Sequence, residues 1–487
     1  MRARQDGTSA RLPHVVATGF TTAFLGDERT LREFVVGDHV VHALREQGTN
    51  AVLYLVNDTY DPLDERQLRV GMDKNPALIR KFRPFCGRPI AEIPDPFDCH
   101  ASYAAHFTAR LTERLRRLDI HPLIIDTHRA YRAGHYAPYI VRTFERYREI
   151  QDAIWARFGQ LVQNLFRMQC PQCGCVDGTS IVSVAEQVRY RCERCGTEGS
   201  ELPSALQGKL NWKLDCAARW NLYRIDTEVF GKAHLAREGT NNVSCLVSRE
   251  FFGGQVPEVV KYGELKIQRE LSGRLLQILP PEALKRMLTE HLSRDLEVTR
   301  DFVAQFAERF EVRPGASYAS FVRQELPRVA LEVAAARVPP EPTGKDEIEI
   351  GALVAHGNAY SQFFHGRQHG LRWPGALVYF DVDAATIKGA RDLVAFALAL
   401  RQGALSSTEL KARCKSYLTS MPPSPALYPF LRRLFGQERG PNIPTLLAIL
   451  PIDFLAMVLA ITECLAEVAA ARAASTSHSD ASARKAA

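Results

Sequence analysis

The sequence lacks the apolar run of ~18 residues that a membrane-spanning helix needs. Its start, MRARQDGTSARLP, is basic but has no apolar centre, so it does not have the pattern of a secretory signal. We find no internal repeat that would indicate a solenoid or a propeller. From these absences we expect a cytoplasmic protein that does not bind membranes.

The composition is that of an ordinary globular protein. Apolar residues make up 46% and charged residues 24% of the 487 positions, and this length suits about three domains. The net charge of +7 permits binding to a polyanion but does not demand it. Eleven cysteines in a chain without a secretory signal indicate thiols or metal ligands, not disulfides. We expect a monomer.

Alternating apolar runs and amphipathic segments predict an α/β fold at the start of the chain. AVLYLV at 51–56 and PLIID at 122–126 have the pattern of buried parallel strands, and helical patterns separate them, as in a doubly wound sheet. From Pro281 the pattern becomes mostly helical, and Val338 to Glu347 has the composition of a linker. The alanine- and serine-rich tail shows no periodic face, so we expect it to be disordered. The segments that we expect are 12–168, 169–200, 201–280, 281–340, 341–470 and 471–487.

Two CxxC pairs give the most specific motif in the chain. Cys170 and Cys173 form the first pair, Cys192 and Cys195 the second, and eighteen residues separate the pairs. Four thiolates at this spacing suit tetrahedral zinc in a ribbon, whereas thiols that merely pack in a core have no reason to pair in this way. Four thiolates leave no open position for water, so the zinc would be structural. Cys175 breaks the symmetry of the pattern and is left out of the set.

The segment TGFTTAFLGDERTLRE, at 18–33, joins a short strand to a helix. The run from His14 to Ala17 predicts the strand, and Thr30 with Glu33 suits a capping box at the start of the helix. Unpaired N–H groups at such a helix start favour phosphate binding. Asp27 and Glu28 lie at this entrance, where they would stabilise the helix dipole but repel a triphosphate.

This segment resembles the first signature of class I lysyl-tRNA synthetases, whose pattern is SGxTPSGxxHxGNxRE. The chain matches it at Gly19, Thr21, Arg32 and Glu33. It differs at two positions: Asp27 replaces the histidine that contacts phosphate, and Arg29 replaces the glycine that lets adenine approach the backbone. Three further stretches resemble the family in the same order: IAEIPDPFDCHASYAAHF, KLNWKLDCAARWNLYRIDTEVFGKAH and FGQERGP.

The resemblance assigns a role to each predicted segment. It implies a Rossmann-like catalytic domain in two halves, at 12–168 and 201–280, around a zinc ribbon insertion at 169–200. A helical connecting region and an α-helical domain similar to an anticodon-binding domain would follow. ATP, lysine or an analogue, and tRNA are the ligands that the resemblance implies, for a role in protein biosynthesis.

WKLDCAARW, at 212–220, is the candidate amino-acid pocket. If it is helical, its spacing puts Trp212, Asp215 and Arg219 near one face, and the resemblance places this segment beside the substrate. A buried carboxylate with aromatic walls would suit the long cationic side chain of lysine. The alternative is an ordinary Asp–Arg pair capped by tryptophans.

Three further residues are candidates for the same site. His234 ends GKAH, which resembles the GKDH that borders this site in the family, although a lone histidine is more often structural. Asn57 and Asp58 follow the second strand, at the carboxyl edge where such sheets bind ligands. An ordinary turn is the alternative for that pair.

The second signature of class I synthetases, a lysine-rich mobile loop, has no counterpart that we can identify. The corresponding region is KYGELKIQRELSGRLLQILPPEALKRM, in which Lys261 and Lys266 are the basic residues nearest the expected position. A charge run of this kind is usually a solvated face. Both ATP-handling elements are therefore altered together.

Four functions remain open from the sequence. The first is a lysyl-tRNA synthetase-like protein that keeps its amino-acid and tRNA sites but has impaired adenylation. The second is an active lysine–tRNA ligase in which Arg29 and Lys261 or Lys266 replace the missing groups. The third is an amino-acid ligase that acts without tRNA, and the fourth is a non-catalytic sensor. The helical C-terminal region favours tRNA contact, because a tRNA-free ligase would be expected to have lost it.

Overall fold

The computed structural model divides into two compact units. The first comprises Met1–Leu276 and Pro281–Val303, and the second Gln277–Pro280 and Ala304–Ala487. The predicted linker lies largely outside the described residues, although its last three residues begin helix α15 (Lys345–His365). The structure describes residues 12–335, 345–369, 382–403, 405–421, 424–437 and 440–483.

A five-stranded parallel sheet forms the centre of the first unit, in the order β10-β9-β1-β2-β3. The chain runs from β1 outward through β2 to β3 and later returns to the other side of β1 with β9 and β10. The topological switch point therefore lies between β1 and β9, where open α/β sheets bind their ligands. The strands are β1 (His14–Phe20), β2 (Ala51–Asn57), β3 (Leu123–Asp126), β9 (Thr227–Gly231) and β10 (Glu258–Tyr262).

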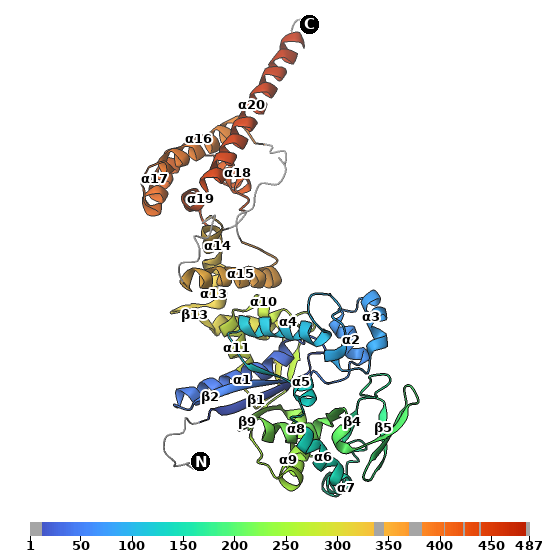
Figure 1. Ribbon diagram of the computed structural model, residues 1–487. Helices are drawn as coiled ribbons and strands as arrows, with labels where there is room; N and C mark the ends of the chain where they lie inside the picture. The colour runs from blue at the N-terminus through green and yellow to red at the C-terminus, as the bar shows by residue number, and fades with distance from the viewer. Residues whose placement is uncertain are drawn as a thin grey trace. The chain divides into compact units, whose positions relative to one another are not determined.

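The predicted strands at the start of the chain and at 51–56 and 122–126 are confirmed as β1, β2 and β3. Figure 1 shows β1 and β2 side by side with α1 (Glu28–Glu46) next to them. Apolar residues of α1 pack on the sheet: Leu31, Phe34, Val35 and Val41 are buried. The fold expected from the sequence, a parallel sheet with helices and a helical C-terminal region, is present.

The start of α1 differs from the prediction. Its N-cap is Asp27, whose carboxylate accepts the backbone N–H of Arg29 at 3.0 Å. The capping box predicted with Thr30 and Glu33 is wrong, because the helix begins earlier and Glu33 bonds across to the strands instead. Aspartate is among the best N-cap residues, so the earlier start has a local cause.

Further helices of the first unit carry several site residues. They are α2 (Glu65–Gly71), α3 (Pro76–Phe82), α4 (Tyr103–Arg117), α5 (Thr127–Arg132), α6 (Ala137–Glu145), α7 (Tyr147–Phe158), α8 (Trp212–Leu222), α9 (Thr240–Val247) and α11 (Pro281–Thr289).

The cysteine-rich segment forms a small antiparallel sheet of β5 (Thr179–Val184), β6 (Val188–Cys192) and β7 (Glu198–Glu201). The pairing of β5 with β6 makes a hairpin between the two CxxC pairs. At the base of this segment, β4 (Phe166–Met168) pairs with β8 (Gly208–Leu210).

The second unit is mainly helical. A short hairpin of β13 (Glu311–Arg313) and β14 (Ala316–Ser317) precedes α13 (Tyr318–Gln324) and α14 (Leu326–Ala335). Leucine and phenylalanine side chains from the later helices share one buried core. Those helices are α16 (Ala384–Arg401), α17 (Ser407–Ser420), α18 (Leu427–Leu434), α19 (Ile443–Ile449) and α20 (Ile452–Ala483).

Helix α20 continues through Ala483, into the range 471–487 where we expected a disordered tail. Within the described residues, none of the helices combines the length and apolar character needed to cross a bilayer.

Candidate functional site

The switch point brings Gly19, Glu33 and Tyr262 together. The backbone N–H of Gly19 donates to Glu33 Oε1 at 2.9 Å, and the Tyr262 hydroxyl donates to Glu33 Oε2 at 2.7 Å. Burial raises the pKa of the Glu33 carboxyl to about 7, although both donors act in the opposite direction. Glu33 was matched to the family pattern in the sequence, but its contact with Tyr262 joins residues too far apart for any local motif to reveal.

Arg219 lies next to Gly19 in the same crevice. Its guanidinium forms a buried ion pair with Glu228 of β9 and lies 4.6 Å from the centre of the Trp212 ring. A Cβ atom at Gly19 would come within 2.9 Å of Arg219 Nη1, so glycine leaves the room that the guanidinium needs. Trp220 Nε1 also donates to Glu228, at 3.2 Å. The Asp–Arg pair weighed as the alternative is not what holds Arg219, since its carboxylate partner is Glu228.

Several buried polar atoms in this crevice have no hydrogen-bond partner among the described residues. They include Nε and Nη1 of Arg219 and Oδ2 of Asp215. An unpaired buried polar atom costs about 1–3 kcal/mol, so such atoms in one place need an explanation. A bound polar ligand or ordered water would satisfy them, and they therefore mark the crevice as a candidate binding site.

Trp212 and His234 meet at a common hydroxyl. Trp212 Nε1 donates to Thr240 Oγ1 at 3.1 Å, and His234 Nδ1 lies 3.2 Å from the same oxygen. Burial, with a smaller contribution from the Arg219 charge, lowers the pKa of His234 and favours the neutral imidazole. The structure thus places the predicted residues Gly19, Trp212, Arg219 and His234 in one cluster.

A buried ammonium group lies between carboxylates at the carboxyl end of β2. Lys209 pairs with Asp58 and, at 2.7 Å, with Asp61, while the Thr21 hydroxyl donates to Asp61 at 2.5 Å. Burial, strengthened by the nearby Asp61 charge, raises the pKa of Asp58 to about 7, whereas Lys209 outweighs burial and keeps the pKa of Asp61 low. Asp58 is therefore paired with a lysine of the chain itself, which sequence reasoning missed, and Thr21 is joined to that lysine only through Asp61.

Asn57 and Asp58 face different sides. Asn57 Nδ2 donates to Thr108 Oγ1 on α4 at 2.8 Å, and Asn57 lines a groove of about 610 Å³ between α4 and the ends of β2 and β3. Asp58 instead accepts from Thr127 and Lys209 in the interior. The two neighbours, predicted as a pair, therefore do not face the same site.

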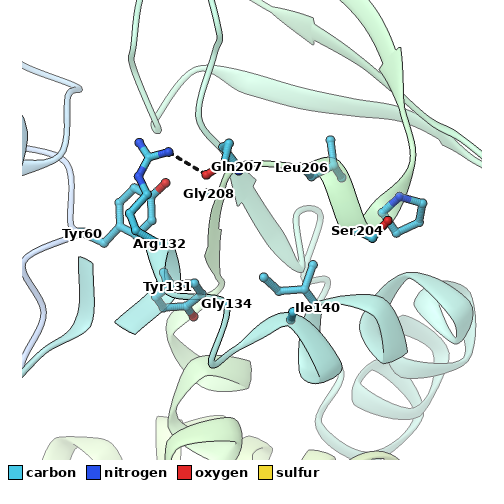
Figure 2. Close-up of a pocket in the computed structure, with 11 residues that line it drawn as sticks. Tyr60, Tyr131, Arg132, Gly134, Ile140, Ser204, Leu206, Gln207 and Gly208 are labelled. Carbon is cyan, nitrogen blue, oxygen red and sulfur yellow. Dashed lines mark hydrogen bonds between the residues drawn. The ribbon is translucent and has the colours of Figure 1, made fainter. Parts of the chain in front are cut away.

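Asp215 is buried on α8, one turn before Arg219. It accepts the Tyr131 hydroxyl at 2.5 Å, and burial raises the pKa of Asp215 despite the nearby cations. Tyr131 also lines a small cavity of about 110 Å³, in which Arg132 lies over the Tyr60 ring and donates to Gln207 at 2.6 Å (Figure 2). This cavity is far below the usual size of a ligand pocket, about 300 Å³ or more, so it is not a candidate amino-acid site.

The N-terminus of α1 is filled by the chain's own side chains. Asp27 accepts from the Arg29 guanidinium at 2.5 Å and from the Ser272 hydroxyl at 2.7 Å. Glu28 is buried and accepts the backbone N–H groups of Gly273 and Leu275, at 2.7 and 2.9 Å. We call these contacts the latch, since two carboxylates at the helix start hold the segment from Ser272 to Leu275.

The charge state of the latch follows from its contacts. Burial would raise the pKa of Asp27, but hydrogen bonds from Arg29 and Ser272 outweigh it and lower the pKa. Asp27 is therefore ionised at neutral pH. Burial raises the pKa of Glu28, against the two backbone donors. An anion that approached the start of α1 would meet a carboxylate that is already paired with Arg29 and a segment already in place.

The two lysines named as substitutes for the second signature are exposed. Lys261 lies on β10, and Lys266 lies on β11 (Leu265–Ile267), which pairs with β12 (Leu296–Val298). Their exposure agrees with the solvated-face alternative as well as with a catalytic role, and the structure by itself favours neither.

The four cysteines of the CxxC pairs converge. Their sulfur atoms lie within 4.8 Å of one another, with 3.6 Å between Cys170 and Cys195 and 3.7 Å between Cys173 and Cys192. Tetrahedral zinc at Zn–S distances of about 2.3 Å requires sulfur separations of about 3.8 Å, which this cluster matches. Cys175 is not part of the set: its sulfur lies near the carbonyl oxygens of Cys86 and Cys173.

A glycine after each CxxC pair shapes the cluster. Gly174 and Gly196 have φ angles of 75° and 76°, a region that other residues rarely adopt. Each donates its N–H back to the first cysteine of its pair, Cys170 or Cys192. The four thiol groups and the two glycine turns thus fit a structural zinc ion.

Known proteins resemble the first unit most clearly. A family model described as "tRNA synthetases class I (K)" matches residues 1–293. A lysine–tRNA ligase of Methanosarcina barkeri (strain Fusaro) is 31% identical over 292 residues, which are 56% of this chain and 52% of that protein. A lysine–tRNA ligase of Archaeoglobus fulgidus is 28% identical over 320 residues, 61% of this chain and 63% of that protein.

These matches leave part of each protein uncovered, since the chain spans about half the length of the first of these relatives. Among solved structures, a glutamate tRNA ligase from Elizabethkingia meningosepticum is 10% identical and covers 93% of this chain and 99% of that one, with a TM-score of 0.45. That score is too low to carry an argument.

Proposed function

Because the chain belongs to the class I lysyl-tRNA synthetase family, we propose that it binds lysine or a close analogue and a tRNA, with impaired ATP-dependent adenylation. The latch at the start of α1 is the observation that carries this proposal. It combines an ionised carboxylate with a bound segment at the helix terminus where such folds hold phosphate.

The crevice at the switch point supports amino-acid binding. Two unpartnered nitrogens of the buried Arg219 guanidinium suit the carboxylate of an amino acid, and charge-assisted bonds of this kind are strong. Asp215 Oδ2 has no hydrogen-bond partner among the described residues, and this atom suits an ammonium group of lysine. The buried Glu33 carboxyl suits the other ammonium group. Trp212 forms an aromatic wall beside Arg219.

The impairment of adenylation follows from charge. Arg29 is paired with Asp27, so its positive charge is already balanced at the start of α1. The backbone N–H groups of Gly273 and Leu275 already donate to Glu28, so a phosphate could accept from them only by displacing that carboxylate. Preorganised donors at developing charge supply a large part of catalysis, and losing one costs about a hundredfold in rate.

A structural zinc ion at Cys170, Cys173, Cys192 and Cys195 is part of the proposal. It would fix the ribbon of β5, β6 and β7, whose base is joined to the first unit through β4 and β8. The ion would have no catalytic role, because four thiolates complete its coordination.

The second candidate is an active lysine–tRNA ligase with an unorthodox ATP site. The exposure of Lys261 and Lys266 is compatible with it, since both side chains are accessible to a nucleotide. In that case Arg29 would have to leave Asp27 when ATP binds. An amino-acid ligase that acts without tRNA, or a sensor, would use the same crevice and would differ in whether tRNA binds.

Calorimetry with lysine and leucine tests the amino-acid site. We expect lysine to bind at least about tenfold more tightly than leucine, the effect of one charge-assisted contact. The Asp215→Ala variant should weaken lysine binding, and the matched Asp119→Ala variant, which removes an exposed carboxylate, should not. Equal binding of lysine and leucine by the unmodified protein would refute the assignment.

A further inference from the structure

Thr21 lies directly after β1, two residues beyond Gly19, and its hydroxyl has one partner among the described residues. The hydroxyl donates to Asp61 Oδ2 at 2.5 Å. An ionised carboxylate can only accept hydrogen bonds, so the single proton of this hydroxyl lies on the side of Asp61. The acceptor sites of the Thr21 oxygen remain open, and the residue is partly exposed.

The charge of Asp61 depends on the buried Lys209. The Lys209 ammonium donates to Asp61 Oδ1 at 2.7 Å and pairs with Asp58 as well. Burial would raise the pKa of Asp61, but the Lys209 charge and hydrogen bonds from Lys209 and Thr21 outweigh burial and lower that pKa. Asp61 is therefore ionised at neutral pH, with Lys209 on one oxygen and Thr21 on the other.

Backbone contacts hold both charged groups in place. The Asp61 carbonyl accepts the N–H of Ile90 at 3.0 Å, which fixes the loop after β2. Lys209 lies on β8, next to Gly208, whose φ is 146°. A Cβ atom at Gly208 would overlap the Arg167 carbonyl oxygen on β4, so glycine is what lets these two strands approach. The orientation of the Thr21 hydroxyl is therefore fixed before any ligand binds.

A hydroxyl with a fixed proton selects the kind of group that it binds. A hydroxyl that rotates freely can bond to a donor or to an acceptor, whereas one whose proton is already used can only accept. An ammonium group is a donor only, and a carboxylate is an acceptor only. A ligand that brought an acceptor to Thr21 would leave two oxygens facing each other without a hydrogen bond, and such a mismatch is what gives polar sites their selectivity.

We propose that Asp61 is a positioning residue that fixes the Thr21 hydroxyl as a hydrogen-bond acceptor for an ammonium group, and that Lys209 is the counter-ion that holds Asp61 in this role. The inference rests on the proposed binding of lysine, since lysine supplies the ammonium group. It assigns a function to two residues that need not touch the ligand: Asp61 acts through Thr21, and Lys209 acts through Asp61.

A double-mutant cycle on lysine binding by the full chain, measured by calorimetry, tests the proposal. Thr21→Val removes the hydroxyl, and Asp61→Asn removes the charge and lets the hydroxyl rotate. We expect each change to weaken lysine binding about tenfold, and the double variant to bind no more weakly than Thr21→Val alone. Asp73→Asn, the same change at an exposed aspartate, is the control. Losses that add in the double variant would overturn the proposal, because Asp61 would then act without Thr21.

Two further measurements separate this proposal from the proposed function. Thermal unfolding of the same proteins without lysine should show the same non-additivity, because the bond between Thr21 and Asp61 forms without a ligand. Additive losses of stability would overturn the proposal.

Thr21→Ser, which keeps a hydroxyl, should recover most of the lysine affinity that Thr21→Val loses, and a loss as large as that of Thr21→Val would also overturn the proposal. An unmodified protein that binds no lysine, together with a non-additive stability cycle, would refute the proposed function and leave the arrangement of Asp61 and Thr21 supported.

Discussion

At the scale of single residues, the candidate site consists of a few buried groups around Gly19. None of them is remote from the others: Glu33 bonds to the Gly19 backbone, and Arg219 occupies the space beside its Cα. Such a crowded position makes small substitutions informative, because an added methyl group has to displace a buried charge.

Gly19→Ala should therefore disturb the amino-acid site more than the fold. Its Cβ would lie 2.9 Å from Arg219 Nη1, so the guanidinium must shift away from the crevice. We expect about 1–3 kcal/mol less stability, typical of overpacking, and lysine binding at least about tenfold weaker. Calorimetry and thermal unfolding measure both effects. Gly403→Ala, where the added Cβ meets ordinary contacts, is the control, and unchanged lysine binding in Gly19→Ala would contradict our view of the crevice.

Glu33 should make stability depend on pH. Burial raises its pKa to about 7 in the folded protein, above the ordinary value of about 4.3. Between these values the folded state holds a proton that the unfolded state has released, so stability falls as pH rises through this range. Glu33→Gln should remove this loss and gain stability relative to the unmodified protein between about pH 5 and about pH 8. Thermal unfolding of both proteins, with Glu46→Gln as an exposed control, would show no such difference if Glu33 titrates normally.

At the scale of elements, the latch joins the start of α1 to the segment from Ser272 to Leu275. Restoring the family residues with Asp27→His plus Arg29→Gly removes one carboxylate and its bond to Ser272. We expect ATP to bind several-fold more tightly, while adenylation does not return, because the lysine-rich loop is still absent. Asp64→His, the same change at the N-cap of α2, is the control. ATP affinity that falls in the double variant would show that Asp27 and Arg29 support nucleotide binding.

The cysteine ribbon should depend on its metal. With no more than three short strands, it buries too little apolar surface to be stable alone. Removing zinc with a chelator should therefore expose residues 169–200 to proteolysis before the parallel sheet unfolds. Mapping the first cleavage sites by mass spectrometry checks this, and first cuts elsewhere would mean that the ribbon does not need the ion.

Local patterns predicted some of these elements and could not predict others. Continuous apolar runs identified β2 and β3, and the spacing of cysteines identified the ribbon, because both signals are contained in a few neighbouring residues. The ion pair of Lys209 with Asp58 joins residues 151 positions apart, and the contact of Glu33 with Tyr262 spans 229. No local pattern carries such pairs, since the fold alone brings them together. The missed start of α1 had a local cause, because Asp27 competed with Thr30 as the cap.

At the scale of the whole molecule, the chain combines a family fold with altered nucleotide signatures. Its sheet order and switch point are those at which open α/β sheets bind ligands, and we propose that its latch opposes the binding of a triphosphate. The second unit supplies a helical body on which tRNA contact would depend. The central claim is therefore that the protein binds substrates of a synthetase and performs its first chemical step poorly.

Exchange of pyrophosphate into ATP in the presence of lysine tests this claim most directly, because it measures adenylation without requiring a tRNA. We predict a rate at least about a hundredfold below that of an active class I lysyl-tRNA synthetase measured in parallel, the effect of losing one or more transition-state donors. Exchange at the rate of that reference enzyme by the unmodified protein would contradict the account. It would establish an active ligase, with Arg29, Lys261 and Lys266 as the groups that replace the missing signatures.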